Sequence, residues 1–278
     1  MARRDGKLVK DLDGNHILMP YLKKKRSYSE LYTNYKVDVT EVVNYVKELK
    51  ASNSESKITY FHVFVAAIGK VMYNRELLNR FVVNKRCYER NNISISFVAK
   101  QEFSDDSGQV MSVIDIDKED NLESISEKLR KRVQRIRQDK TKNDPIAVIG
   151  KLPKIIRDFI MFIFMRLDIY DKLPMSIVHH NIYYSSVLVT DIGSLGFGAI
   201  YHNLTDFGTN SILISIGNIH KEVVVNDLGK EEIRDMVELG ITVDERIADG
   251  FYFIKSMKLL EEIFKDPKML EEVVSKKI

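Results

Sequence analysis

The feature that most constrains the fold is the run from Lys57 to Met72, which reads K-I-T-Y-F-H-V-F-V-A-A-I-G-K-V-M. Its apolar residues fall on every face of a helix rather than on one stripe, and such a helix is stable only when other elements surround it. Thr59 is a suitable N-cap, and His62 is expected to be a hydrogen-bonded core group. We therefore expect this helix to be central and buried.

Three further segments have apolar residues at helical spacing on one face only. They are residues 36–49, with Asp38 or Thr40 as a cap, residues 120–137, and residues 253–264, which Asp266 and Pro267 end. The exposed face of the second helix is basic, which indicates a solvated face rather than an anion site. These helices are expected to cover a sheet.

Strands are predicted wherever the period changes to two. Residues 92–97 and 110–116 indicate a hairpin with a loop at S-D-D-S-G, and residues 185–190, 211–216 and 236–244 indicate three more strands. The predicted fold class is α/β, with a mixed and largely antiparallel sheet.

Composition excludes several classes of protein. The chain has 278 residues, 44% of them hydrophobic, and its 5 Pro and 13 Gly are scattered, so we expect one domain over residues 1–278. A formal charge of +3 gives no reason to expect a nucleic-acid partner. Cys87 is the one cysteine, which favours a cytoplasmic protein with an inert thiol, and the N-terminus has no signal-peptide pattern.

One apolar segment, Ile155 to Leu167, is too short and too often charged to be a transmembrane segment. We expect a helix that is buried against the domain or a neighbouring subunit, with contact to lipid or another partner as the alternative. Elsewhere, His179 and His180 have no cysteine or carboxylate cluster beside them, so no metal site is predicted.

Four stretches, in order, resemble the catalytic domain of the 2-oxoacid dehydrogenase acyltransferases (dihydrolipoamide acyltransferases), which share the chloramphenicol acetyltransferase-like fold. They are V-D-V-T at Val37, K-I-T-Y-F-H-V-F-V-A-A-I with the following E-L-L-N-R-F, V-T-D-I-G-S-L-G at Val189, and V-D-E-R-I-A-D-G at Val243. The resemblance extends from about Tyr21 to about Glu272. It implies a two-layer sandwich, a homotrimer with active sites between subunits, and a close-packed turn at 192–198.

The resemblance also implies a mechanism. A histidine that opens an H-x-x-x-D-G motif acts as general base on the thiol of coenzyme A or dihydrolipoamide, and a hydroxyl from a neighbouring subunit binds the oxyanion. Carried over residue by residue, the base position is Glu245, the motif aspartate is Asp249, its glycine is Gly250 and the hydroxyl is Thr190. Coenzyme A or acyl-coenzyme A is the implied co-substrate, although no residue is assigned to bind it.

The chain departs from the family pattern at Glu245, because the catalytic histidine is missing. Residues 1–278 are also expected to contain no lipoyl or peripheral-subunit-binding domain, and no covalent lipoyl group. Three interpretations of the site stay open. Glu245 is a working base if burial raises its low intrinsic pKa, it is an ion-pair partner without a catalytic role, or His202 supplies the imidazole.

Two functions follow from these alternatives. The first is a coenzyme A-dependent acyltransferase that acts on a small thiol, amine or hydroxyl acceptor. The second is a catalytically inactive, trimeric relative that binds a ligand or scaffolds other proteins.

Overall fold

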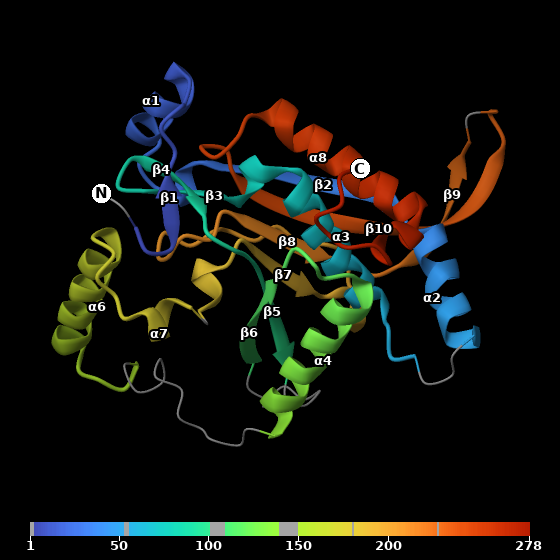
Figure 1. Ribbon diagram of the computed structural model, residues 1–278, viewed down its shortest axis with the longest axis horizontal. Helices are drawn as coiled ribbons and strands as arrows, with labels where there is room; N and C mark the ends of the chain where they lie inside the picture. Colours follow the sequence, from blue (N-terminus) through green and yellow to red (C-terminus); the bar gives the residue numbers. More distant parts are fainter. Residues whose placement is uncertain (1–2, 53–55, 101–108, 139–149, 180, 227) are drawn as a thin grey trace.

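A central helix and a mixed sheet organise the molecule (Figure 1). The computed structural model describes residues 3–278 except 53–55, 101–108, 139–149, 180 and 227. Its helices are α1 (Gly14–Leu22), α2 (Thr40–Ser52), α3 (Tyr60–Asn74), α4 (Leu122–Gln138), α6 (Lys154–Ile169), α7 (Met175–Val178) and α8 (Gly250–Lys265). Its strands are β1 (Gly6–Leu8), β2 (Glu30–Asp38), β3 (Arg80–Val83), β4 (Arg86–Arg90), β5 (Ile93–Lys100), β6 (Gln109–Ile116), β7 (Val187–Asp191), β8 (Ile212–Ile216), β9 (His220–Val225) and β10 (Glu231–Asp244).

The main sheet has the strand order β2-β10-β8-β7-β5-β6, and β9 pairs with the first part of β10. Strand β7 is parallel to both of its neighbours, and the other pairs are antiparallel. A separate three-stranded sheet has the order β1-β4-β3. The predicted α/β class with a mixed, largely antiparallel sheet is confirmed.

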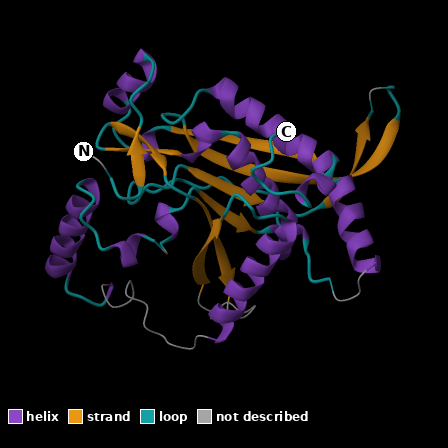
Figure 2. Ribbon diagram, in the orientation of Figure 1, coloured by secondary structure: helices purple, strands orange, loops and turns teal. Residues whose placement is uncertain are grey.

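Helix α3 is the central buried helix that its sequence predicts. Helices α2, α4 and α8 flank it and form one layer with it against the sheet (Figure 2). Its side chains from His62 to Met72 are buried, including Lys70, whose Nζ donates to Val273 O at 3.1 Å. His62 Nδ1 accepts a hydrogen bond from Thr59 N at 3.3 Å, so the predicted cap and the predicted core histidine form one capping pair.

Most predicted segments are found close to their expected bounds. The hairpin β5–β6, the strands β7, β8 and β10, and the helices α4 and α8 are confirmed, while the S-D-D-S-G loop lies outside the described residues. The predicted helix from Lys36 is wrong in its first three residues, because Lys36 to Asp38 complete β2. The Asp38 carboxylate then accepts hydrogen bonds from Thr40 N at 2.9 Å and Thr40 Oγ1 at 2.6 Å as α2 begins.

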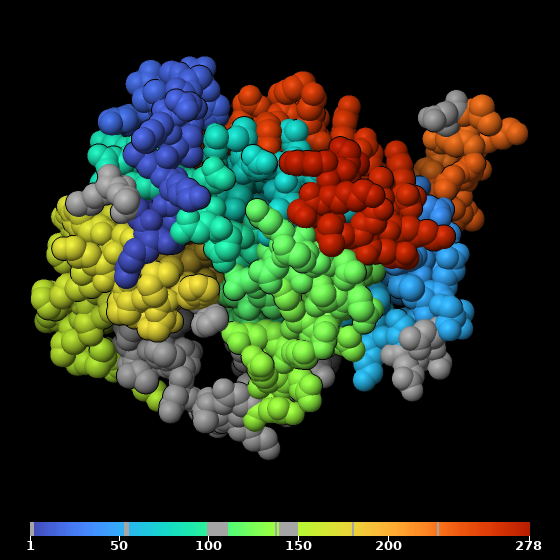
Figure 3. All heavy atoms as spheres, in the orientation of Figure 1, coloured from blue at the N-terminus to red at the C-terminus, as the bar shows by residue number. Residues whose placement is uncertain are grey.

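Helix α6 differs from the prediction in its surroundings. It lies at one side of the molecule, beside α7 and the N-terminal residues, where it forms an outer edge (Figures 1 and 3). Ile155 is 85% exposed and Phe159 is 63% exposed, so burial of this helix against its own chain is wrong. Only its inner face packs, through Phe164 and Leu167, onto a small cluster. In the described part of the chain, no helix is long and apolar enough to cross a membrane.

Candidate active site

The turn that carries Glu245 joins the end of β10 to the start of α8. Glu245 N donates to Ser29 O at 2.9 Å, and Ile247 N donates to Asp244 O at 3.1 Å. Asp249 is the N-cap of α8, where its carboxylate accepts from Tyr252 N at 2.7 Å. Asp249 therefore sets the geometry of the turn. Gly250 is not required by sterics within the chain, because a Cβ at this position would contact nothing within 4 Å.

The side chain of Glu245 forms an ion pair with Lys23, which follows α1. The Glu245 side chain is 26% exposed and the Lys23 side chain 39% exposed, so the pair lies at the surface of the isolated chain. Arg246 Nη1 donates to Lys23 O at 3.1 Å and holds the backbone of Lys23 beside the turn. Lys23 could not be predicted from the sequence, because only the folded chain brings the end of α1 to the end of β10.

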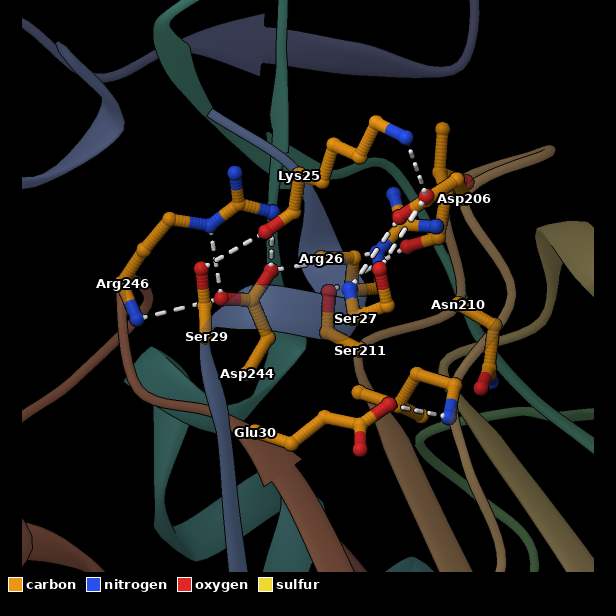
Figure 4. Close-up of polar contacts among 12 residues, drawn as sticks. Lys25, Arg26, Ser27, Ser29, Glu30, Asp206, Asn210, Ser211, Asp244 and Arg246 are labelled. Carbon is orange, nitrogen blue, oxygen red and sulfur yellow. Dashed lines mark hydrogen bonds and ion pairs between the residues drawn. The ribbon is translucent and has the colours of Figure 1, made fainter. Parts of the chain in front are cut away.

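The two residues that flank Glu245 pair with each other beneath the turn (Figure 4). Arg246 donates from Nε to Asp244 Oδ1 at 2.8 Å and from Nη2 to Asp244 Oδ2 at 2.7 Å, and the Asp244 side chain is fully buried. Arg26 Nε lies 3.8 Å from Asp244 Oδ2. Burial lowers the pKa of Arg26, and the nearby Asp244 carboxylate opposes that shift. The buried Asp244 carboxylate thus pairs with Arg246 and lies beside Arg26, while Glu245 pairs with Lys23.

Residues 197–204, called the strap here, cross the face of the sheet that the helices do not cover. The strap contains His202. Thr242 Oγ1 donates to His202 O at 2.8 Å, and Glu30 Oε1 accepts from Leu204 N at 2.7 Å. The strap lies close to β10, because a Cβ at Gly240 would meet Ile200 O at 2.6 Å. The backbone of His202 is therefore fixed, while the residue itself is exposed.

Thr190 lies near the C-terminal end of β7, and Glu245 follows β10 at the opposite end of the strands. Thr190 is aligned with Ser215 on β8, which is aligned with Gly240 on β10. Two strand spacings and five residues along β10 separate Thr190 from Glu245, which is about 20 Å. The His202 backbone is hydrogen-bonded to Thr242, which lies on β10 between Gly240 and Glu245. One chain therefore does not bring Thr190 and Glu245 together.

A cavity of about 370 Å³ opens beside Asp191, between the end of β7 and the start of α3. It is lined by Thr59, Tyr60, Phe61, Phe64, Asp191, Gly193, Ser194, Ile216, Gly217 and Ile219. Burial raises the pKa of Asp191, whose carboxylate accepts from Ser194 N at 3.2 Å. The turn at 192–198 is close-packed at Gly193, where a Cβ would lie 2.2 Å from Gly217 O, but it is open at Gly196, where a Cβ would meet nothing within 4 Å. Sequence reasoning missed Asp191, although it directly follows Thr190.

The cysteine and the other histidine residues considered in the sequence, where the structure describes them, lie outside this site. Cys87 is buried in β4, and burial raises the pKa of its thiol to about 11, which fits an inert residue. Burial lowers the pKa of His62 to about 4, which keeps its ring neutral and able to accept from Thr59 N. His179 ends α7, and His180 lies outside the described residues.

A comparison with protein families matches residues 19–147 to the acyltransferase catalytic domain of the 2-oxoacid dehydrogenases. The predicted resemblance to this family is confirmed. The match contains the V-D-V-T and K-I-T-Y motifs, but it ends before Thr190 and Glu245. No curated protein sequence matches the chain significantly.

Solved structures of this family extend the likeness to nearly the whole chain. A probable dihydrolipoamide acetyltransferase from Listeria monocytogenes 4b F2365 is 19% identical, with a TM-score of 0.60 over 94% of this chain and 95% of that chain. The dihydrolipoamide acetyltransferase of Azotobacter vinelandii is 14% identical, with a TM-score of 0.61 over 96% and 95%. Chloramphenicol acetyltransferase is 10% identical, with a TM-score of 0.54 over 93% and 99%. At these identities the likeness establishes the fold, which is the predicted chloramphenicol acetyltransferase-like fold.

Proposed function

We propose that this protein is a coenzyme A-dependent acyltransferase that transfers an acyl group to a small thiol, amine or hydroxyl acceptor. The family match and the shared fold support the reaction class. The Azotobacter vinelandii enzyme was studied for the roles of a serine, a histidine and an asparagine in its catalytic mechanism. Its histidine and asparagine are four positions apart, as Glu245 and Asp249 are.

The active site lies between subunits of a trimer. The observation that carries this proposal is the separation of about 20 Å between Thr190 and Glu245 in one chain. A hydroxyl and a base must both reach the same acyl carbon, so two residues at this distance act together only when another copy completes the site. Thr190 is half-buried at one end of the strands and Glu245 is partly exposed at the other end.

Glu245 carries the proton in this mechanism. Its carboxylate takes the proton from the acceptor as the acceptor attacks the thioester carbonyl, and the Thr190 hydroxyl donates to the oxyanion of the tetrahedral intermediate. The carbon–sulfur bond then breaks, and the Glu245 carboxylic acid returns the proton to the coenzyme A thiolate. Lys23 holds the carboxylate in position through its ion pair.

The direct test is release of free coenzyme A thiol from acyl-coenzyme A in the presence of a panel of thiol, amine and hydroxyl acceptors. We expect Glu245→Gln to lower kcat/KM by roughly 10²- to 10⁴-fold, the usual contribution of a general base. Thr190→Val is expected to lower it by roughly 10²- to 10³-fold, as for loss of one oxyanion donor. Asp235→Asn, a surface substitution on β10, serves as the control.

Two results would contradict the proposal. The first is the absence of thiol release above the level of the Glu245→Gln and Thr190→Val proteins with every donor and acceptor. The second is a gain of acetyltransferase activity in Glu245→His from an inactive parent, which would identify a non-catalytic relative that has lost its base.

A further inference from the structure

Helix α6 presents an apolar surface to solvent. Its exposed outer face consists of Ile155, Ile156, Phe159, Phe162, Ile163 and Ile169. At 100° per residue these positions occupy an arc of about 140° on the helix. A contiguous exposed patch of this kind marks an interaction site.

Contacts on the inner side of α6 set the orientation of its outer face. Phe164 and Leu167, on the opposite side of the helix, pack onto the cluster that contains Leu173 and Tyr184. Arg3 Nη1 donates to Asp168 O at 2.9 Å and ties the end of the helix to the N-terminal residues. The outer face therefore points away from the molecule, as the outer edge in Figure 3 illustrates.

Basic residues outnumber unpaired acids around α6. Four basic residues are exposed, namely Lys151, Lys154, Arg166 and Lys172. Of the acids, Asp168 is buried beside Arg3, Asp171 pairs with Arg4, and Asp158 pairs with Lys154. Among the residues that the structure describes, Lys151, Arg166 and Lys172 remain without an acidic partner, so the apolar face is accompanied by a net positive charge.

An anionic lipid surface complements this arrangement. Apolar side chains enter the boundary between headgroups and acyl chains, while the basic side chains near them contact the headgroups. The 16 residues of α6 are fewer than the roughly 20 that a spanning helix needs, so the helix would lie in the plane of the interface. A second copy that used the same face would instead bring like charges together.

We propose that the α6 outer face is a binding site for anionic membrane surfaces. The test is co-sedimentation of the full chain with vesicles of phosphatidylcholine mixed with phosphatidylserine, and with vesicles of phosphatidylcholine alone. The wild-type protein binds the mixed vesicles, and high salt weakens this binding. Replacement of both Lys151 and Lys172 by Gln weakens it roughly fivefold per residue.

A matched pair of variants separates α6 from exposed apolar residues in general. Phe159→Ser with Phe162→Ser removes side chains that are 63% and 57% exposed, and weakens vesicle binding at least about tenfold. Phe251→Ser with Ile254→Ser on α8 removes side chains of 66% and 59% exposure at the same spacing and leaves binding unchanged. Circular dichroism confirms that each variant is folded.

Three outcomes would overturn the proposal. The wild-type protein stays in the supernatant with the mixed vesicles, or the α8 pair loses binding as strongly as the α6 pair does. In the third, the Phe159→Ser, Phe162→Ser variant differs from the wild-type protein in oligomeric mass by light scattering, and the wild-type protein does not bind vesicles. That result would assign the face to a contact between copies of this chain.

Discussion

Glu245 is partly exposed, its backbone N donates to Ser29 O, and its side chain pairs with Lys23. Its position at the end of a strand could be predicted from the alternation of residues 236–244, and the turn itself from the motif that contains Asp249 and Gly250. The sequence could not show whether Asp244 or Arg246 would act on the carboxylate. In the folded chain these two pair with each other, and Lys23 contacts Glu245. Side-chain direction at a turn depends on contacts that sequence spacing does not encode.

His202 tests which residue handles the proton. The mechanism above assigns that task to Glu245, so His202→Asn should change kcat/KM for thiol release less than fivefold, against roughly 10²-fold or more for Glu245→Gln. Asn keeps the backbone contact with Thr242, because that contact uses the carbonyl of residue 202. A larger loss in His202→Asn than in Glu245→Gln would assign the base to His202.

His62 makes stability depend on pH. Its pKa falls from 6.5 to about 4 on folding because the ring is buried, so the unfolded chain binds more protons between these values. The stabilisation is present above pH 6.5 and is lost as the pH falls toward 4, by roughly 2 kcal/mol at pH 4.5. Urea unfolding at pH 7.5 and 4.5 measures this change.

The control for that measurement is His62→Asn, which keeps an acceptor for Thr59 N but does not titrate. Its free energy of unfolding should depend less on pH than that of the wild-type protein, by the same roughly 2 kcal/mol. Equal pH dependence in the two proteins would show that His62 is not responsible.

At the scale of elements, helices were easier to predict than strands. The apolar spacing of α3, α4 and α8 predicts which of their residues are buried, because all three helices contribute to one large hydrophobic core. Strand β2 was missed because it is paired along one side only, with β10, and most of its residues remain exposed, so its sequence has no clear alternation. The apolar run of α6 predicted a helix correctly but not its exposure, since composition does not show which surface a helix contacts.

The turn between β10 and α8 depends on the buried Asp244. Asp244→Asn should lower the free energy of unfolding by about 3 kcal/mol, because two buried guanidinium groups lose their counter-charge. Chemical denaturation measures this loss. Asp235→Asn is the matched control: the Asp235 side chain is 15% exposed but its cationic partner, Lys221, is 70% exposed, so the change should be smaller, about 1 kcal/mol. Similar losses in the two variants would refute the role of the buried cluster.

At the scale of the whole molecule, the sheet separates the two residues on which the proposed reaction depends. The resemblance predicted both Thr190 and Glu245 as site residues, and the strand order explains why they cannot meet in one chain. The cavity beside Asp191 could not be predicted, because its walls come from α3, β7 and β8 together. The proposed site residues thus come from the resemblance, and the strand order supports the proposal that a second subunit completes the site.

Complementation between two inactive variants tests this central claim most directly. Purified Thr190→Val and Glu245→Gln proteins are each assayed for thiol release, then unfolded together in equal amounts, refolded and assayed again. If sites are shared between neighbours, the mixture recovers about one quarter of wild-type activity, because half of the subunits supply Thr190 and half of their neighbours supply Glu245. If the mixture stays as inactive as its components while refolded wild-type protein is active, the shared site is contradicted.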